Sequence, residues 1–124
     1  MKNRPFIYRI GYALQGFREG WRRGTSFRIQ LVAATGATLL LTLFQARPIW
    51  WATLAITVAG VLGAELFNTA LEETLDLLHP EIDPRIARAK DCAAAAVLVL
   101  SLASLVVLGA FLWEVFGLYV TVQP

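Results

Sequence analysis

The sequence predicts an all-α membrane protein in which an amphipathic surface helix precedes three membrane-spanning helices. Three observations support this fold class. The 124-residue chain is 57% hydrophobic and only 16% charged, whereas an ordinary soluble domain is about a quarter charged. The charges gather in residues 1–28 and 65–91, and only Arg47 and Glu114 lie elsewhere. The stretches between these two groups are long enough to cross a bilayer, which takes roughly 20 apolar residues.

The N-terminal segment, about residues 4–26, is expected to form a helix on the membrane surface. Its apolar side chains recur at spacings of three and four residues, and its basic side chains largely occupy the other face. Such a helix lies in the headgroup layer and is held there by anionic lipid. A secretory signal is excluded because Arg9 and Arg18 interrupt the apolar run. The alternative is an ordinary basic tail beside the membrane.

Three spans are expected after the surface helix, at about residues 29–46, 49–78 and 87–115. The first and third contain uncharged stretches of suitable length for a bilayer. The second is uncharged only as far as Glu65, so this carboxylate is expected within the hydrocarbon layer or at its edge. Together the surface helix and the spans make a single domain of residues 1–124.

The basic residues predict the orientation of the chain. With the N-terminus in the cytoplasm, ten of the eleven Lys and Arg residues fall inside, in residues 1–28 and 79–91, and only Arg47 falls outside. Cytoplasmic segments carry the excess of Lys and Arg, so the N-terminus and the 79–91 loop are predicted to be cytoplasmic. The net charge of +2 gives no indication of nucleic acid as a partner; the lipid bilayer is the predicted one.

A polar stripe follows the second span where it leaves the apolar layer. At about 100° per residue, one face about 100° wide carries six polar side chains: Glu65, Asn68, Thr69, Glu72, Asp76 and His79. Charge in hydrocarbon is costly, so the stripe must face a partner helix, water or a bound ion. The deeper Glu65 suits a general base, and Glu72 suits Mg²⁺ beside phosphate oxygens. The alternative is that these groups only hydrogen-bond across helices and fix the packing.

A second polar cluster directly precedes the third span. Lys90 is a mobile cation suited to phosphates, and Asp91 falls in a first helical turn, where a carboxylate complements the helix dipole. Basic residues at the inner end of a span are more often topology anchors, so the pattern alone leaves both roles open. The sequence contains no Gly-rich phosphate loop and no protein-kinase signature, which excludes a soluble type of nucleotide fold.

Two segments together resemble one known family. Residues 65–72 read Glu-Leu-Phe-Asn-Thr-Ala-Leu-Glu, and residues 89–97 read Ala-Lys-Asp-Cys-Ala-Ala-Ala-Ala-Val. At this spacing they resemble the signatures of the prokaryotic diacylglycerol kinases, which include undecaprenol kinases. The resemblance implies a homotrimeric lipid kinase of the prokaryotic inner or plasma membrane, with active sites shared between subunits. It implies ATP as co-substrate, Mg²⁺ as cofactor, and undecaprenol, diacylglycerol or another lipid alcohol as acceptor.

The resemblance also implies roles for individual residues. Glu65 would take the proton from the lipid hydroxyl, Asn68 would support the transferred phosphate, and Glu72 would bind the metal on ATP. The implied ATP-binding set is Tyr12, Glu72, Glu81, Asp83, Lys90 and Asp91. The implied lipid-substrate set is Glu65, Phe27, Arg28 and Gln30.

One position departs from the family pattern. Members commonly carry a second metal-binding Glu three residues before the Phe of a Phe-Arg pair, and here that position is Gly24. Glycine has no side chain to bind a metal. The nearby Glu19 or Glu73 could compensate, but neither is at the expected position. The departure keeps an alternative open: a catalytically degenerate family member, or a small oligomeric membrane protein such as a channel, without kinase activity.

Overall fold

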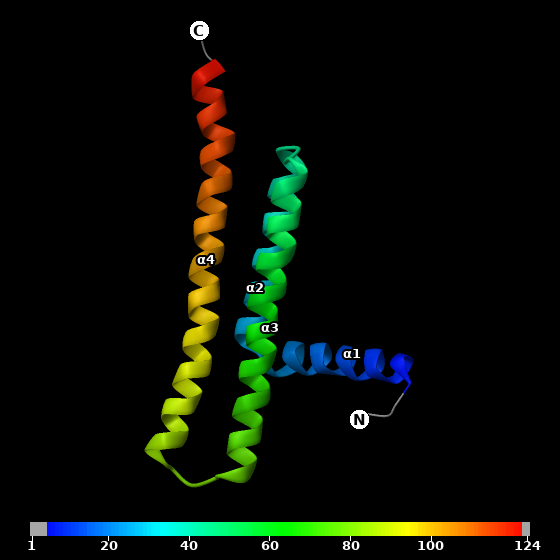
Figure 1. The fold of residues 1–124 in the computed structure, drawn as a ribbon, viewed down its shortest axis with the longest axis vertical. Helices are drawn as coiled ribbons and strands as arrows, with labels where there is room; N and C mark the ends of the chain where they lie inside the picture. The colour runs from blue at the N-terminus through cyan, green and yellow to red at the C-terminus, as the bar shows by residue number, and fades with distance from the viewer. Residues whose placement is uncertain (1–4, 123–124) are drawn as a thin grey trace.

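The computed structural model describes residues 5–122, and describes side chains up to residue 117. This part of the chain forms four helices: α1 (Phe6–Arg23), α2 (Thr25–Leu43), α3 (Pro48–Leu78) and α4 (Pro84–Val122). The last three run side by side as an antiparallel bundle, and α1 projects away from it (Figure 1). The predicted fold class, a first helix followed by three apolar helices, is confirmed.

Three of these helices, α2, α3 and α4, are long and apolar enough to cross a membrane. α2 begins four residues before the expected 29–46 span because it follows α1 with only Gly24 between them. It ends where Gln45 adopts a positive φ of 47° and the Ala46 N–H donates to Leu41 O at 2.9 Å, a Schellman-type closure. α4 begins at Pro84, since proline is well suited to the first helical position.

The corner between α1 and α2 is tight because two glycines form it. The Gly24 N–H donates to Gly20 O at 2.9 Å. A Cβ on Gly24 would lie 2.8 Å from that same oxygen, and a Cβ on Gly20 would lie 2.6 Å from Cδ2 of Leu66 on α3. The two glycines therefore allow α1 to approach α3 at the residue next to Glu65. Phe27 fills the corner and is only 2% exposed.

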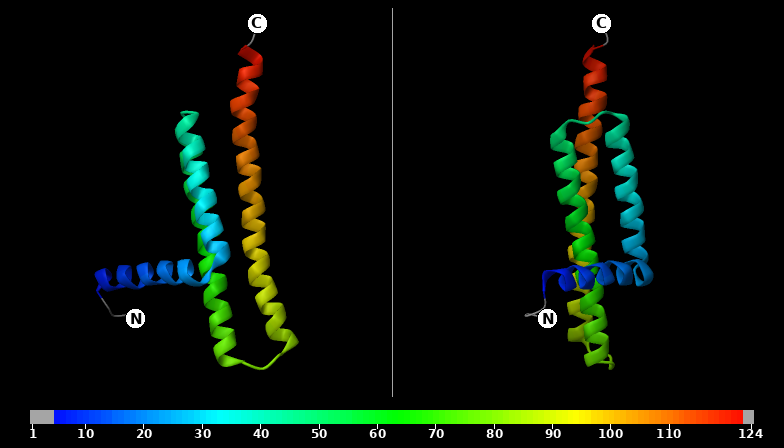
Figure 2. Two further views of the ribbon diagram at one scale, coloured as in Figure 1. Left: turned by 180° about the vertical axis from the view of Figure 1, so that it is seen from behind. Right: turned by 90° about the vertical axis from the view of Figure 1, so that its right-hand side faces the viewer.

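Helix α1 projects from the bundle (Figure 2), and most of its apolar face is left exposed by the rest of the described chain. Large apolar side chains are exposed along it: Phe6, Ile7, Ile10, Leu14, Phe17 and Trp21. Such a helix suits the headgroup layer, with its apolar face buried among acyl chains and its arginines in water.

At the opposite end of the bundle, the α2–α3 connection is fastened to α4. Arg47 donates from Nε and Nη2 to the carboxylate of Glu114 at 3.0 and 2.6 Å, and Trp50 Nε1 donates to it at 3.1 Å. Beneath this cluster Phe111 packs edge-on against Trp50 and Phe44. Arg47 and Glu114, the two charged residues outside segments 1–28 and 65–91, therefore form an ion pair that joins the α2–α3 connection to α4.

Candidate active site

An apolar cavity of about 300 Å³ lies between α2, α3 and α4. Its α3 wall is a stripe of residues three and four positions apart: Leu54, Thr57, Val58, Val61 and Leu62. Because side chains at these spacings share a helix face, the next position of the stripe toward the α3–α4 loop is Glu65. The cavity wall thus leads from the Trp50–Phe111 end of the bundle to a carboxylate.

Glu65 is buried although it carries a carboxylate, with 6% of its surface exposed. It lies at the level of the α1–α2 corner, since the next residue, Leu66, packs against Gly20. None of the ion pairs among the described residues includes Glu65. Glu65 therefore belongs to no ion pair of the described residues, and a buried carboxylate of this kind is a candidate functional residue.

One turn along the same face, Asn68 and Glu72 form a pair. Asn68 Nδ2 donates to Glu72 Oε1 at 3.0 Å, whereas the Thr69 hydroxyl donates to the backbone oxygen of Glu65. The other amide atom, Asn68 Oδ1, is buried and has no hydrogen-bond partner among the described residues. A buried polar atom without a partner is costly, so this face offers an acceptor oxygen to a donor from outside the described chain.

The donor set around Glu72 fits a Mg²⁺ ion that is shared with phosphates. Glu72 is half-buried and one of its oxygens accepts from Asn68, which orients the carboxylate. Among the described residues, no three acidic, His or Cys side chains converge as a closed metal site. Mg²⁺ is usually bound by one or two carboxylates together with substrate phosphates and water, so a single oriented carboxylate is sufficient on the protein side.

The α3–α4 loop is braced by two ion pairs. Lys90 Nζ pairs with Asp76 on the polar stripe of α3, which draws the start of α4 toward that stripe. Asp83 caps α4: its Oδ1 accepts the backbone N–H of Arg85 at 2.7 Å, and its Oδ2 accepts Arg85 Nη2 at 2.9 Å. The Arg85 guanidinium and backbone N–H hold the pKa of Asp83 below its ordinary value.

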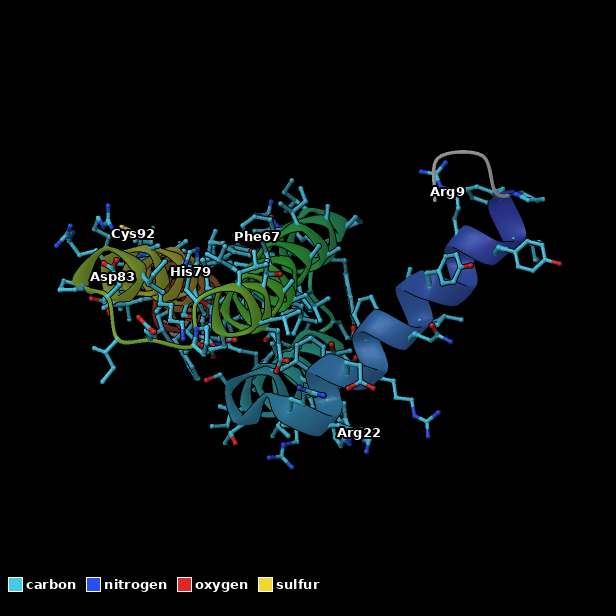
Figure 3. The ribbon with its side chains drawn as sticks, turned by 90° about the horizontal axis from the view of Figure 1, so that it is seen from below. Arg9, Arg22, Phe67, His79, Asp83 and Cys92 are labelled. Carbon is cyan, nitrogen blue, oxygen red and sulfur yellow. The ribbon has the colours of Figure 1, made fainter. Side chains whose placement is uncertain are left out.

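The other residues of the expected nucleotide set lie apart from this face within one chain. Glu81 is exposed in the α3–α4 loop, and Tyr12 is exposed midway along α1. Asp91 is exposed about two turns into α4, not in a first helical turn as predicted, because α4 already begins at Pro84. Seen from the loop end, Arg9 lies on the far part of α1, away from the bundle, and Arg22 lies near the α1–α2 corner, while His79 and Asp83 lie around the loop (Figure 3).

The expected lipid-side residues take three different positions. Phe27 is buried in the α1–α2 corner, and Arg28 is exposed, with Nη2 donating to Thr25 Oγ1 at 3.3 Å. Gln30 turns toward α4, where its Nε2 donates to Ser101 Oγ at 2.8 Å. Only Gln30 among these three lines the apolar cavity.

Arg23 makes a contact between α1 and α3 that sequence reasoning missed. Its Nη1 donates to Glu73 Oε1 at 2.5 Å and its Nε to Glu19 Oε2 at 3.3 Å, and both partners raise its pKa. The two acids that stood as replacements for a metal ligand at Gly24 are thus both paired with one guanidinium. Glu73 is 50 positions from Arg23, so only the packing of α1 on α3 reveals the pair.

Comparison with known proteins agrees with this arrangement of helices and signatures. Residues 11–112 match the family described as prokaryotic diacylglycerol kinase. The chain belongs to this family. It is 30% identical to the diacylglycerol kinase of Escherichia coli strain K12 over 111 residues, 90% of this chain and 91% of that protein.

Two further relatives are an undecaprenol kinase and a diacylglycerol kinase. The chain is 31% identical to the undecaprenol kinase of Bacillus subtilis strain 168 over 102 residues, 82% of this chain and 83% of that protein. It is 35% identical to a diacylglycerol kinase of Synechocystis sp. over 102 residues, 82% of this chain and 58% of that protein. This prokaryotic-type kinase is therefore a membrane protein and a lipid kinase.

Proposed function

We propose that this kinase transfers the γ-phosphate of ATP to the hydroxyl of a membrane lipid alcohol, with Glu65 as the general base. The observation that carries the proposal is the buried carboxylate of Glu65, which has no cationic partner among the described residues and lies one turn beyond Val61 and Leu62 of the cavity wall. A lipid hydroxyl comes from the bilayer and ATP from water, so they meet where the α3 stripe passes from one to the other. Phosphoryl transfer chiefly requires positioning, charge neutralisation and an acceptor for the hydroxyl proton.

In the proposed reaction the proton of the lipid hydroxyl passes to the Glu65 carboxylate as the hydroxyl oxygen forms its bond to the γ-phosphorus. The bond from the γ-phosphorus to the bridging oxygen breaks, and ADP leaves with that electron pair. Asn68 presents its amide between the two carboxylates and holds Glu72 in place. Glu72 would hold Mg²⁺, which when bound neutralises phosphate charge.

The nucleotide would lie at the loop end of the stripe. Lys90 is paired with the polar stripe there, and in the proposed complex its ammonium exchanges Asp76 for phosphate oxygens. Glu81 and Asp83 lie in the same loop, and Asp91 lies next to Lys90 on α4. Tyr12 lies on the part of α1 that projects from its own bundle, which supports a proposed homotrimer in which α1 covers the site of a neighbouring subunit. Phe27, Arg28 and Gln30 complete the lipid side.

The proposed orientation follows the basic residues. The N-terminus and the 79–91 loop hold ten of the eleven Lys and Arg residues, so both are proposed to be cytoplasmic. This places the loop end of the stripe on the side of the membrane where ATP is found. The inner or plasma membrane of a prokaryote is the proposed location.

The experiment that tests the proposed function is transfer of radiolabel from ATP to lipid by the detergent-purified protein with Mg²⁺. Undecaprenol, diacylglycerol and a sample without lipid are compared. Glu65→Gln is expected to lose about 10²–10⁴-fold in transfer, the typical contribution of a general base. Glu73→Gln is the matched control, because this neighbouring acid is exposed and paired with Arg23. Full activity of Glu65→Gln would refute the assignment of the base.

A degenerate kinase is the second candidate, and Gly24 favours it. The position lacks a metal-binding side chain, and Glu19 and Glu73 are both paired with Arg23. This candidate predicts no labelled lipid from any acceptor at saturating Mg²⁺ and ATP, together with normal assembly in the membrane. Labelled lipid from the wild-type protein would exclude it.

A further inference from the structure

The apolar cavity contains one polar bridge between helices. Gln30 on α2 donates from Nε2 to Ser101 Oγ on α4 at 2.8 Å, and both side chains line the cavity. Most of the other lining side chains are Ala, Val, Leu or aromatic. This pair is therefore the point at which the cavity can recognise a polar group of an occupant.

The Ser101 hydroxyl differs from the other hydroxyls of the same cavity wall. Ser104 donates to Leu100 O at 2.8 Å and Thr57 donates to Thr53 O at 2.7 Å, so both protons are used within their own helices. Ser101 Oγ accepts from Gln30, and among the described residues its own proton has no acceptor. Ser101 is half-buried, and a hydroxyl proton without a partner beside apolar side chains is costly. An occupant with an acceptor oxygen would remove that cost.

The packing of α3 on α4 gives the position of Ser101 relative to Glu65. A Cβ on Gly60 would lie 3.8 Å from Cδ2 of Leu100, so these two residues are level. Ser101 lies one residue beyond Leu100 away from the α3–α4 loop, and Glu65 lies five residues beyond Gly60 toward it, so the two residues are about 9 Å apart along the bundle axis at 1.5 Å per residue. Side chains lean toward the N-terminus of their own helix. Because α3 and α4 are antiparallel, Glu65 and Ser101 lean toward each other.

We propose that Ser101, oriented by Gln30, is a specificity-determining residue that donates to an ester carbonyl of the lipid acceptor. The acceptor class is then a glycerolipid with ester-linked chains, whose carbonyl oxygens lie a few covalent bonds from its free hydroxyl. With the hydroxyl at Glu65, an ester carbonyl reaches the level of Ser101 and the acyl chain continues toward the closed Trp50–Phe111 end. The inference rests on the proposed function, since it assigns the acceptor of the same site.

Apart from its own alcohol group, a polyprenol has no oxygen that could accept a hydrogen bond from the Ser101 hydroxyl. Beyond its alcohol the molecule is hydrocarbon, so the Ser101 proton would stay without an acceptor while the cavity is filled. The same holds for a glycerolipid with ether-linked chains, which lacks the carbonyl oxygens. The bridge therefore favours the diester over both, and the size of the preference is that of one hydrogen bond.

The first test compares Ser101→Ala with Ser104→Ala in steady-state phosphorylation of a diester diacylglycerol, its diether analogue and undecaprenol. Ser101→Ala is expected to raise the KM for the diester about two- to tenfold, the value of one neutral hydrogen bond, and to leave kcat and the diether KM unchanged. Ser104→Ala, whose proton serves its own helix, should change neither. Ser101→Thr keeps the hydroxyl and should keep the preference. Equal effects of Ser101→Ala on diester and diether would overturn the proposal.

A binding measurement separates this inference from the kinase activity. Trp50 lines the cavity, and replacing the other three tryptophans by Phe makes it the sole indole. Its fluorescence is quenched by a diacylglycerol with brominated chains in micelles, and unlabelled diester, diether and undecaprenol compete for the cavity. The diester should compete best, and Ser101→Ala should remove its advantage. If undecaprenol competes better than the diester, the inference is wrong. If the wild type phosphorylates no lipid, the proposed function fails, but the competition measurement still decides which class of lipid the cavity binds.

Discussion

Asn68 on α3 donates its amide N–H to Oε1 of Glu72 at 3.0 Å, one helical turn along the same face. This hydrogen bond joins Asn68, which lies between Glu65 and Glu72 on the helix face, to Glu72, the carboxylate proposed to hold Mg²⁺. It also leaves Asn68 Oδ1 buried and without a partner among the described residues. Glu72 is therefore an oriented carboxylate, and Asn68, one turn from the buried Glu65, has an amide oxygen that can accept a hydrogen bond.

Replacing Asn68 by Ala should lower kcat and raise the Mg²⁺ concentration needed for half-maximal activity. The substitution releases the Glu72 carboxylate, and loss of a partner that orients a metal ligand typically costs about 10–100-fold in affinity or activity. The measurement is a Mg²⁺ titration of kinase activity at saturating ATP. Thr69→Val is the control, because the Thr69 hydroxyl serves the helix backbone. An unchanged Mg²⁺ requirement in Asn68→Ala would contradict this role.

Gly20→Ala should push α1 away from α3, and Leu66→Ala should restore the contact. A Cβ at position 20 lies 2.6 Å from Cδ2 of Leu66, and overpacking of this kind typically costs about 1–3 kcal/mol. Thermal unfolding in detergent measures the cost, and the double variant Gly20→Ala/Leu66→Ala should recover part of it. If Gly20→Ala alone is as stable as the wild type, the close approach of the helices is not required.

Gly24→Glu should fail to supply a second metal ligand. Any Cβ at this position lies 2.8 Å from the backbone oxygen of Gly20, so the α1–α2 corner must open before the carboxylate can be used. Gly24→Ala should therefore disturb the corner as much as Gly24→Glu does. Unfolding temperature and Mg²⁺ dependence are measured for both variants. Higher activity of Gly24→Glu with an intact corner would show that the backbone adapts.

Asp83 should make the stability of the loop depend on pH. Its folded pKa lies below the ordinary value of about 3.9, so its ionised form stabilises the fold above that pH. The contribution is lost as the pH falls through the folded value. Asp83→Asn keeps an N-cap acceptor and removes the charge. The unfolding temperature of the wild type minus that of Asp83→Asn should therefore shrink between pH 6 and pH 3, and a constant difference would count against the Arg85 contact.

The sequence predicted a first helix, three long apolar helices after it and the polar stripe, because each depends on local periodicity. Glu65, Asn68 and Glu72 share a face through helical spacing alone. Contacts between distant segments could not be predicted in this way. Arg23 meets Glu73, and Gln30 meets Ser101, only because α1, α2 and α4 pack on or beside α3.

The helix ends were also beyond sequence periodicity. α2 begins at Thr25 because two glycines permit a sharp corner, and it ends early because Gln45 takes a left-handed conformation. The ion pair between Arg47 and Glu114 joins two charged residues that lie far from any other charge along the sequence. Steric room and long-range pairing decide these features, and neither follows from a pattern of apolar residues.

The central claim is that Glu65 accepts the hydroxyl proton, and it is tested most directly by measuring ATP binding and phosphate transfer in the same Glu65→Gln sample. We predict that Mg²⁺–ATP binds about as well as to the wild type, because Glu72 and Lys90 remain, while transfer at saturating lipid falls about 10²–10⁴-fold. Transfer within a few fold of the wild-type rate would contradict the claim.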